Sequence, residues 1–222
     1  MMKKLKLSLV IALLGMVSLV NAQSASVTVK GGLNMSNFYG KNLSDKNVKA
    51  GFHAGVGLDL EFVTNISLQT GLYYTSKGAE YTTNIKGPVG DVEYDVTANY
   101  IQLPIHIAYK MEVKPETRLF LHAGPYLAYG VGGKRTIEKK SDLNSIPDYL
   151  GAEEINTFDK DFGYKPFDYG VGVGVGIEFD LFLIDLGWDM GLKNIARNIN
   201  EIPVYKPKVK NQSAYLSIGY KF

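Results

Sequence analysis

The sequence predicts an all-β fold, an eight-stranded antiparallel up-and-down transmembrane β-barrel. Three observations point to it. Hydrophobic residues recur with a period of two, short and long connections alternate along the chain, and the face opposite the apolar one is rich in glycine and ionisable residues. The length of 222 residues suits one domain of this kind.

The alternation is clearest in residues 52–62 and 167–180. In the second segment, valine, isoleucine and aromatic residues occupy one parity, whereas glycine, glutamate and aspartate occupy the other. Successive side chains of a strand point to opposite faces, so each segment is predicted to be a strand with one apolar face. The same pattern predicts eight strands, at residues 25–37, 51–63, 65–84, 92–110, 117–134, 164–181, 182–194 and 211–222.

The connections between these strands alternate in length. The short turns lie near residues 63–65, 111–116 and 181. The longer, polar connections span residues 39–50, 85–91, 134–163 and 194–210. Outer-membrane barrels have short periplasmic turns and longer extracellular loops. Because an even number of strands returns the chain to the side where it started, both termini are expected in the periplasm.

Periodicity alone fits two architectures, a soluble lipocalin-like barrel with its apolar face inside and a membrane barrel with its apolar face outside. The glycines favour the membrane barrel, because the narrow interior of eight strands needs glycine where large side chains cross it. Aromatic residues near the ends of the apolar faces also favour it, since such rings prefer the lipid–water boundary. They are Phe52, Phe62, Tyr74, Tyr109, Phe167, Phe179, Trp188, Tyr220 and Phe222.

Both ends of the chain carry features of an exported barrel. Residues 1–22 combine a basic start, an apolar run and a small-residue site, which predicts a signal peptide cleaved between Ala22 and Gln23. Residues 23–222 then form the barrel domain. The last strand resembles the sorting signal read by the barrel-assembly machinery, through Leu216, Ile218, Tyr220 and Phe222. The expected location is the outer membrane of a Gram-negative bacterium.

The polar face is expected to line the lumen. Burying unpaired charge is costly, so carboxylates should pair there with Lys30, Lys77, Lys110 and Arg118. Nine residues are assigned to this lumen network: Lys30, His53, Asp59, Glu61, His106, His122, Glu178, Asp185 and Asp189. Eight strands leave room only for side chains, so no pore is expected.

No catalytic, cofactor or metal site is predicted. The chain has no cysteine, and its three histidines lack the tight spacing with carboxylates that a metal site needs. The serines show no nucleophile-elbow pattern, so we do not expect an enzyme. The 24 Lys+Arg and 22 Asp+Glu are nearly balanced, which gives no basis for nucleic-acid binding.

Binding is expected in the outside loops. The connection at 134–163 is the candidate interaction loop, with Tyr149, Glu153 and Glu154, because loops on a rigid scaffold often bind partners. The last connection is basic and suits the anionic head groups of outer-membrane lipid and lipopolysaccharide. Its basic residues are Arg197, Lys206, Lys208 and Lys210. Other expected partners are the barrel-assembly machinery and an unidentified surface partner, and the chain is expected to be a monomer.

Several short motifs occur in an order that matches a known family. They are Val29-Lys30-Gly31-Gly32-Leu33-Asn34, Gly51-Phe52-His53-Ala54-Gly55, Ser76-Lys77-Gly78-Ala79, Tyr100-Ile101-Gln102-Leu103-Pro104, Ala123-Gly124-Pro125-Tyr126, Gly191-Leu192-Lys193-Asn194-Ile195 and the final Leu216-Ser217-Ile218-Gly219-Tyr220-Lys221-Phe222. This ordered set resembles the PorT-like outer-membrane β-barrel family of Bacteroidetes. The resemblance implies an eight-stranded outer-membrane barrel and little about activity, although one branch of the family is tied to type nine secretion of surface proteins.

The residues and the resemblance together predict an integral outer-membrane barrel with a side-chain-filled lumen and a structural or adhesive role at the cell surface. Three alternatives stay open. The chain could be an accessory component of protein secretion at the outer membrane, a soluble periplasmic lipocalin-like carrier, or a lipid-modifying outer-membrane enzyme that uses the histidines.

Overall fold

The computed structural model describes residues 24–40, 46–85, 90–140, 155–159, 163–196 and 208–222. The predicted signal peptide, with its cleavage site at Ala22 and Gln23, lies outside these residues, and so do Tyr149, Glu153 and Glu154 of the candidate interaction loop. Among the described residues, no helix has the length and apolarity that crossing a membrane requires.

The described chain forms strands throughout. They are β1 (Ser24–Tyr39), β2 (Lys46–Val63), β3 (Ile66–Ile85), β4 (Gly90–Lys114), β5 (Thr117–Lys140), β6 (Ile155–Asn156), β7 (Phe167–Phe179), β8 (Phe182–Gly191) and β9 (Lys210–Lys221). All long strands pair antiparallel, β1 with β9 and β4 with β5 among them, so they close into an eight-stranded barrel. The two-residue β6 pairs only with β5. The predicted fold is therefore confirmed.

Several strands differ from their predicted ends: β2 begins at Lys46 rather than residue 51, β4 ends at Lys114 rather than residue 110, and β8 ends at Gly191 rather than residue 194. The differences in β5 and β7 have clear physical reasons. β5 continues to Lys140 rather than ending near residue 134, because it keeps its pairing with β4 beyond the apolar band. β7 begins at Phe167 rather than at residue 164, because Tyr164 leaves the wall and packs across the mouth of the barrel. Pro166, just before β7, has no backbone N–H to donate to a ladder.

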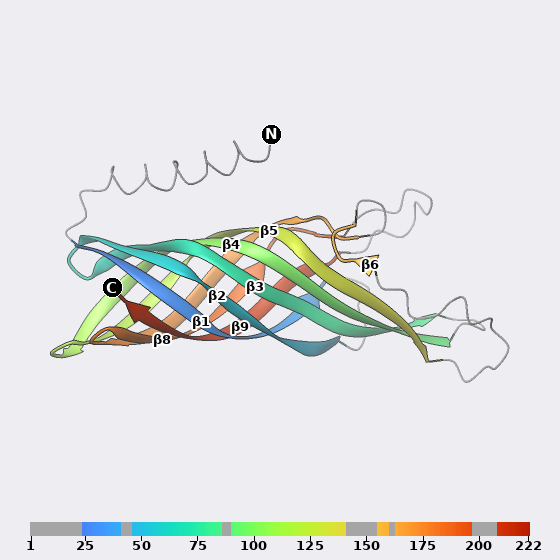
Figure 1. Cartoon of the computed structure of the whole chain (residues 1–222), viewed down its shortest axis with the longest axis horizontal. Helices are drawn as coiled ribbons and strands as arrows, with labels where there is room; N and C mark the ends of the chain where they lie inside the picture. Colours follow the sequence, from blue (N-terminus) through green and yellow to red (C-terminus); the bar gives the residue numbers. More distant parts are fainter. Residues whose placement is uncertain (1–23, 41–45, 86–89, 141–154, 160–162, 197–207) are drawn as a thin grey trace.

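Three tight turns lie at the end of the barrel that also holds the C-terminus (Figure 1). Each contains one residue with the left-handed backbone that tight hairpins favour: Asn65 with φ 70°, Glu116 with φ 61° and Asp180 with φ 51°. Asp180 thus lies in a turn and not on the lumen face. Short turns face the periplasm in barrels of this kind, which places the opposite end outside the cell.

Apolar side chains face outward along the whole middle of the barrel. On β7, Val171, Val173 and Val175 are 45–52% exposed, whereas the glycines and acidic residues of the other parity are buried. A soluble lipocalin-like carrier needs the reverse arrangement, with valine inside and charge outside. The observed faces exclude that alternative.

The pattern inverts where β3, β4 and β5 extend beyond the other strands (Figure 1). On β4 the outward residues change from Ile101 to Asn99 and Thr97, while the inward residues change from Gln102 to Val96. The inward face there belongs to an apolar cluster of Phe38, Ala79, Val96, Tyr164, Ile195, Ala196 and Val209. The outward face of these strands is therefore apolar where it contacts lipid and polar where it extends into water.

The face assignment predicts opposite defects at two neighbouring residues. Val173 is the central residue of β7 and faces lipid, so Val173→Arg should block stable insertion, at a cost of about 2–4 kcal/mol. Gly174→Arg should fail by overpacking instead, because even a Cβ there would lie 2.7 Å from Cε1 of His122. The measurement is the folded fraction in lipid vesicles, read from the faster migration of an unboiled barrel on gels. Val173→Leu is the control, and normal assembly of Val173→Arg would reverse the assignment.

Candidate functional site

The structure places all nine residues of the sequence-based lumen network inside the barrel. They form three groups along its axis. The periplasmic group contains Asp59, Glu61 and Glu178; the central group contains Lys30, His53, His106, His122 and Asp185; the outer group contains Asp189. Each side chain reaches the lumen because it has the inward parity of its strand.

In the periplasmic group, cations and carboxylates neutralise each other. The Lys110 ammonium lies 2.6 Å from Asp59 Oδ2 and 3.1 Å from Glu178 Oε1, and its side chain is only 1% exposed. Arg118 contacts Glu178 at 2.9 Å and Glu61 at 3.4 Å. Buried charges of this kind persist only when they are paired. This group fills the lumen just inside the periplasmic opening.

A chain of hydrogen bonds crosses the central lumen. Lys30 Nζ lies 3.1 Å from Asp185 Oδ2, and the other oxygen of Asp185 lies 3.0 Å from Nε2 of His122. His122 Nδ1 is 2.9 Å from His106 Nδ1, and the two rings stack with centroids 5.0 Å apart. The rings fit because β7 carries glycine opposite them. A Cβ on Gly172 would lie 2.9 Å from Cε1 of His106.

The third histidine belongs to a separate arrangement. His53 Nδ1 lies 2.6 Å from Asn34 Oδ1, and His53 Nε2 lies 2.7 Å from Ser217 Oγ. The amide nitrogen of Asn34 is occupied by Thr75 Oγ1 at 2.9 Å and by two carbonyls, so Asn34 Oδ1 must accept from His53. His53 Nε2 is then free to accept from Ser217. Chemically, this is the order nucleophile, base and orienting group.

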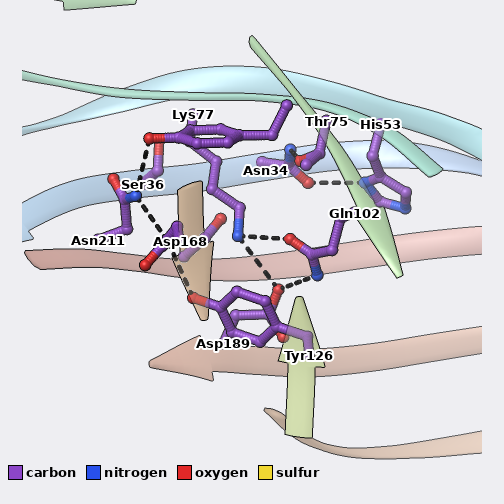
Figure 2. A network of polar contacts seen from close by, with 12 residues as sticks. Asn34, Ser36, His53, Thr75, Lys77, Gln102, Tyr126, Asp168, Asp189 and Asn211 are labelled. Atoms are coloured by element: carbon purple, nitrogen blue, oxygen red, sulfur yellow. Dashed lines mark hydrogen bonds and ion pairs between the residues drawn. The ribbon is translucent and has the colours of Figure 1, made fainter. Parts of the chain in front are cut away.

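The outer group centres on Asp189. Gln102 Nε2 donates to Asp189 Oδ2 at 2.7 Å, while Lys77 Nζ lies 2.7 Å from Gln102 Oε1 and 3.4 Å from Asp189 (Figure 2). Lys77 also lies 4.7 Å above the ring of Tyr126. These contacts join β3, β4, β5 and β8 across the lumen.

A second layer lies further outward in the lumen. Asn211 Nδ2 donates to Asp168 Oδ2 at 2.8 Å, and Tyr126 Oη lies 3.4 Å from Asp168 (Figure 2). Asn211 Nδ2 also donates to Tyr100 Oη at 3.1 Å. Tyr100 and Tyr126 are fully buried. The sequence pattern placed Asp168 on the polar face but did not include it in the lumen network, and it missed Tyr100, Tyr126 and Asn211, although their parity matches that of neighbouring lumen residues and could have found them.

An apolar plug closes the outer mouth of the barrel. The ring of Phe158 lies edge-on to Tyr100, with centroids 5.3 Å apart, and covers Gly130 so closely that no side chain would fit there. Thr157 holds this segment by donating to the Thr97 carbonyl at 2.6 Å. Above it, Tyr164 packs on Phe38. Phe158 lies in the long connection after β5, where no periodic signal marks it, and Tyr164 was assigned to the predicted strand 164–181 rather than to the plug.

A cavity of about 80 Å³ lies in the central lumen, lined by Lys30, Asn34, His53, Tyr73, Lys77, His106, His122, Asp185, Tyr215 and Ser217 among others. Sites for drug-sized ligands measure about 300–1,000 Å³. Among the described residues, no group of three or more histidine and acidic side chains could hold a metal ion. The lumen is therefore chemically a paired network with space for water or a very small solute.

The buried pairing predicts a large loss when one partner is removed. Lys110→Met leaves the carboxylates of Asp59 and Glu178 without their shared cation, and it should lower the free energy of unfolding by about 3–5 kcal/mol. The measurement is urea unfolding of the barrel in vesicles. Lys114→Met, at an exposed position of the same strand, is the matched control and should change little. Equal stability of the two variants would show that the network contributes nothing.

Three solved structures resemble the chain. A major outer membrane protein from Thermus thermophilus is 14% identical with a TM-score of 0.49, and the match covers 90% of this chain and 100% of that one. Neisserial surface protein A is 13% identical, with a TM-score of 0.46 and the same coverage. OprG from Pseudomonas aeruginosa is 14% identical, with a TM-score of 0.46 and coverage of 90% and 97%.

No curated protein sequence matches the chain significantly. A family model described as outer membrane protein beta-barrel domain matches residues 21–197, most of the chain. That match includes the strands that carry the lumen network, from β1 to β8. It agrees with the closed barrel, the lipid-facing valines and the predicted location in the outer membrane. The chain belongs to the outer membrane protein beta-barrel domain family.

Proposed function

We propose that the chain is a closed, non-conducting barrel that serves as a structural or adhesive platform at the cell surface. The observation that carries this proposal is the combination of a filled lumen with a wall that rises beyond the bilayer. The lumen holds paired charges and an apolar plug, so it offers no continuous path for solutes. What reaches outside is the wall of β3, β4 and β5 (Figure 1).

The projecting wall has the properties of a protein-binding surface. Its outward face is polar, with Asn99, Thr97 and an ion pair between Asp95 and Lys49. Its inward face packs on the apolar cluster around Val96, which keeps the sheet rigid. A rigid sheet loses little entropy when a partner binds it. Tyr149, Glu153 and Glu154 follow β5 in sequence and remain the proposed contact residues of the loop.

This proposal predicts where a partner can be captured. A photoreactive benzoylphenylalanine at Thr97, on the wall, should give protein adducts on intact cells, and the yield should fall when a short glycine–serine linker replaces residues 141–154. The same probe at Leu121, which is 60% exposed and faces lipid, is the control and should give only lipid adducts. Mass spectrometry of the adducts is the measurement. Protein adducts at both positions, or at neither, would contradict the proposal.

We also propose that the chain is not an enzyme, although Ser217, His53 and Asn34 have the hydrogen bonds of a hydrolase triad. Ser217 is 2% exposed and faces a cavity of about 80 Å³, which is too small for a lipid acyl chain. A triad that no substrate reaches acts as a structural link between β1, β2 and β9.

The lipid-modifying alternative makes a different prediction that is simple to test. A fluorophosphonate probe should leave Ser217 of the folded wild-type barrel unlabelled, because the probe cannot enter the cavity. Peptide mass spectrometry checks this, with Ser213→Ala as the control for the other buried serine of β9 that lines the cavity. A Ser217 adduct that disappears in His53→Gln would establish an activated nucleophile and favour the enzyme.

The finer assignments are proposals as well. Membership in the PorT-like branch is supported only by the ordered motifs, and some of their glycines have packing reasons. A Cβ on Gly124 would lie 2.8 Å from the backbone of His106, for example. Motifs explained by packing say little about secretion, so the role of secretion accessory remains second to that of platform.

We also propose that the chain is a monomer, because the closed barrel leaves no long strand unpaired among the described residues. We propose as well that the barrel-assembly machinery folds it and recognises the outward-facing Leu216, Ile218, Tyr220 and Phe222.

A further inference from the structure

The short wall of the barrel, opposite the projecting one, ends in a rim of lysines and aromatic rings. Lys193 Nζ lies 4.3 Å from the ring centroid of Phe167, and Lys210 Nζ lies 5.6 Å from that of Tyr39. Phe167, Lys210 and Tyr39 lie at the outer ends of β7, β9 and β1, and Lys193 follows the outer end of β8 by two residues. These four strands are consecutive neighbours in the barrel. With a strand spacing of about 4.8 Å, the two rings on β7 and β1 are three spacings, or about 14 Å, apart.

The rim lies at the height where the outer surface changes from apolar to polar. On β1 and β9 the outward pairs proceed from Met35–Ala214 to Asn37–Gln212 and then to Tyr39–Lys210. Gln212 and Asn37 satisfy each other with a hydrogen bond of 2.7 Å. Polar amides on a lipid-facing surface mark the edge of the hydrocarbon. Lys210 lies one residue pair above that edge, which is the height of lipid head groups, and Lys193 lies three residues beyond Met190, the partner of Gln212 on β8.

The rim is ordered by hydrogen bonds between segments far apart in sequence. The Lys165 amide donates to the Ile195 carbonyl at 2.8 Å, and the Ile195 amide donates to the Val209 carbonyl at 2.9 Å. The Tyr39 hydroxyl donates to the Gly191 carbonyl, which ties β1 to β8. The lysines thus project from a folded edge rather than from a free loop.

The charges of the rim are not compensated by the described chain. Every lysine and arginine assigned to the lumen has a carboxylate partner. Within the residues that the structure describes, none of the four rim lysines forms an ion pair; they are Lys165, Lys193, Lys208 and Lys210. The opposite mouth carries charges of both signs, with Glu112, Glu116, Asp180 and Arg118 around its opening. Among the described residues, the rim therefore presents cations without anionic partners at head-group height.

We propose that this rim binds a diphosphorylated glycolipid of the outer leaflet. Lys193 leans toward β7 and Lys210 toward β1, so the two ammonium groups are held apart and suit phosphates at the two ends of a disaccharide head group. The acyl chains then lie on the apolar wall below, along Tyr169, Met190 and Ala214. A phospholipid with one phosphate engages only one of the two lysines. This site does not depend on the proposed platform, which uses the other wall.

The test is native mass spectrometry of the full mature chain, titrated with diphosphoryl lipid A in mixed micelles. Each lysine at an anionic surface contributes about fivefold to affinity, so Lys193→Gln/Lys210→Gln should weaken binding about 25-fold. Lys114→Gln, at an exposed position of the periplasmic end, is the matched control and should bind like the wild type. None of these side chains belongs to the lumen network, so each variant is expected to fold. Faster migration of the unboiled sample on gels in cold detergent verifies that it does.

Three further arms identify the ligand source. Monophosphoryl lipid A and phosphatidylglycerol should each bind the wild type about fivefold more weakly or worse, and inorganic phosphate should not compete at equal concentration. Equal affinity for phosphatidylglycerol and lipid A would overturn the two-phosphate site. Unchanged lipid A binding by the double variant, or an equal loss in Lys114→Gln, would overturn the rim as its location. Loss of surface cross-links at Thr97 would leave this result unaffected, so the two proposals fail separately.

Discussion

The surrounding hydrocarbon is the constraint on which the rest of the structure depends. Lipid offers no hydrogen bonds, so every backbone group in the bilayer must find its partner within the barrel, and the first strand, β1, must close on the last, β9. Closure with eight strands leaves a lumen only as wide as its side chains. The ionisable residues cannot face lipid, so they turn into this narrow space, where Lys110 must pair with Asp59 and Glu178. Glycines on β7 then make room for His106 and His122.

The same constraint explains why the outer part of the barrel looks like a soluble protein. Once β3, β4 and β5 leave the hydrocarbon, water solvates their outer face and apolar residues gain by turning inward. β4 follows this rule without changing its backbone parity: Ile101 faces lipid, while Val96 five residues earlier is buried in the cluster with Phe38 and Tyr164. The apolar plug results from this inward turn of the apolar residues, because an apolar interior at the outer end closes the polar lumen below it.

Sequence periodicity was sufficient for most of the fold, because alternation reports directly on a strand with two different environments. It placed the strands and the lumen side of Lys30, His53 and Asp185. It could not identify pairs such as Lys110 with Asp59, since strands β2 and β4 are not neighbours and their relative height depends on the shear of the closed barrel. Periodicity also could not predict the role of Phe158 in the plug, because this residue lies in a connection and connections have no hydrophobic period. Tyr100 and Tyr126 were within reach through parity, but aromatic residues were expected to face lipid.

The two walls of the barrel meet the cell surface in different ways, and their heights explain why. The wall of β3 to β5 carries polar residues far above the bilayer, so it can contact only solutes or other macromolecules. The wall of β7, β8, β9 and β1 ends at the head groups, so its lysines can be neutralised only by lipid or by the chain itself. Lipid held on the short wall fixes the tilt and depth of the barrel, because it adds charge contacts to an otherwise non-directional apolar band. A fixed tilt in turn sets the direction of the projecting wall of β3, β4 and β5. Lipid bound to the short wall therefore orients the proposed protein-binding surface on the opposite wall.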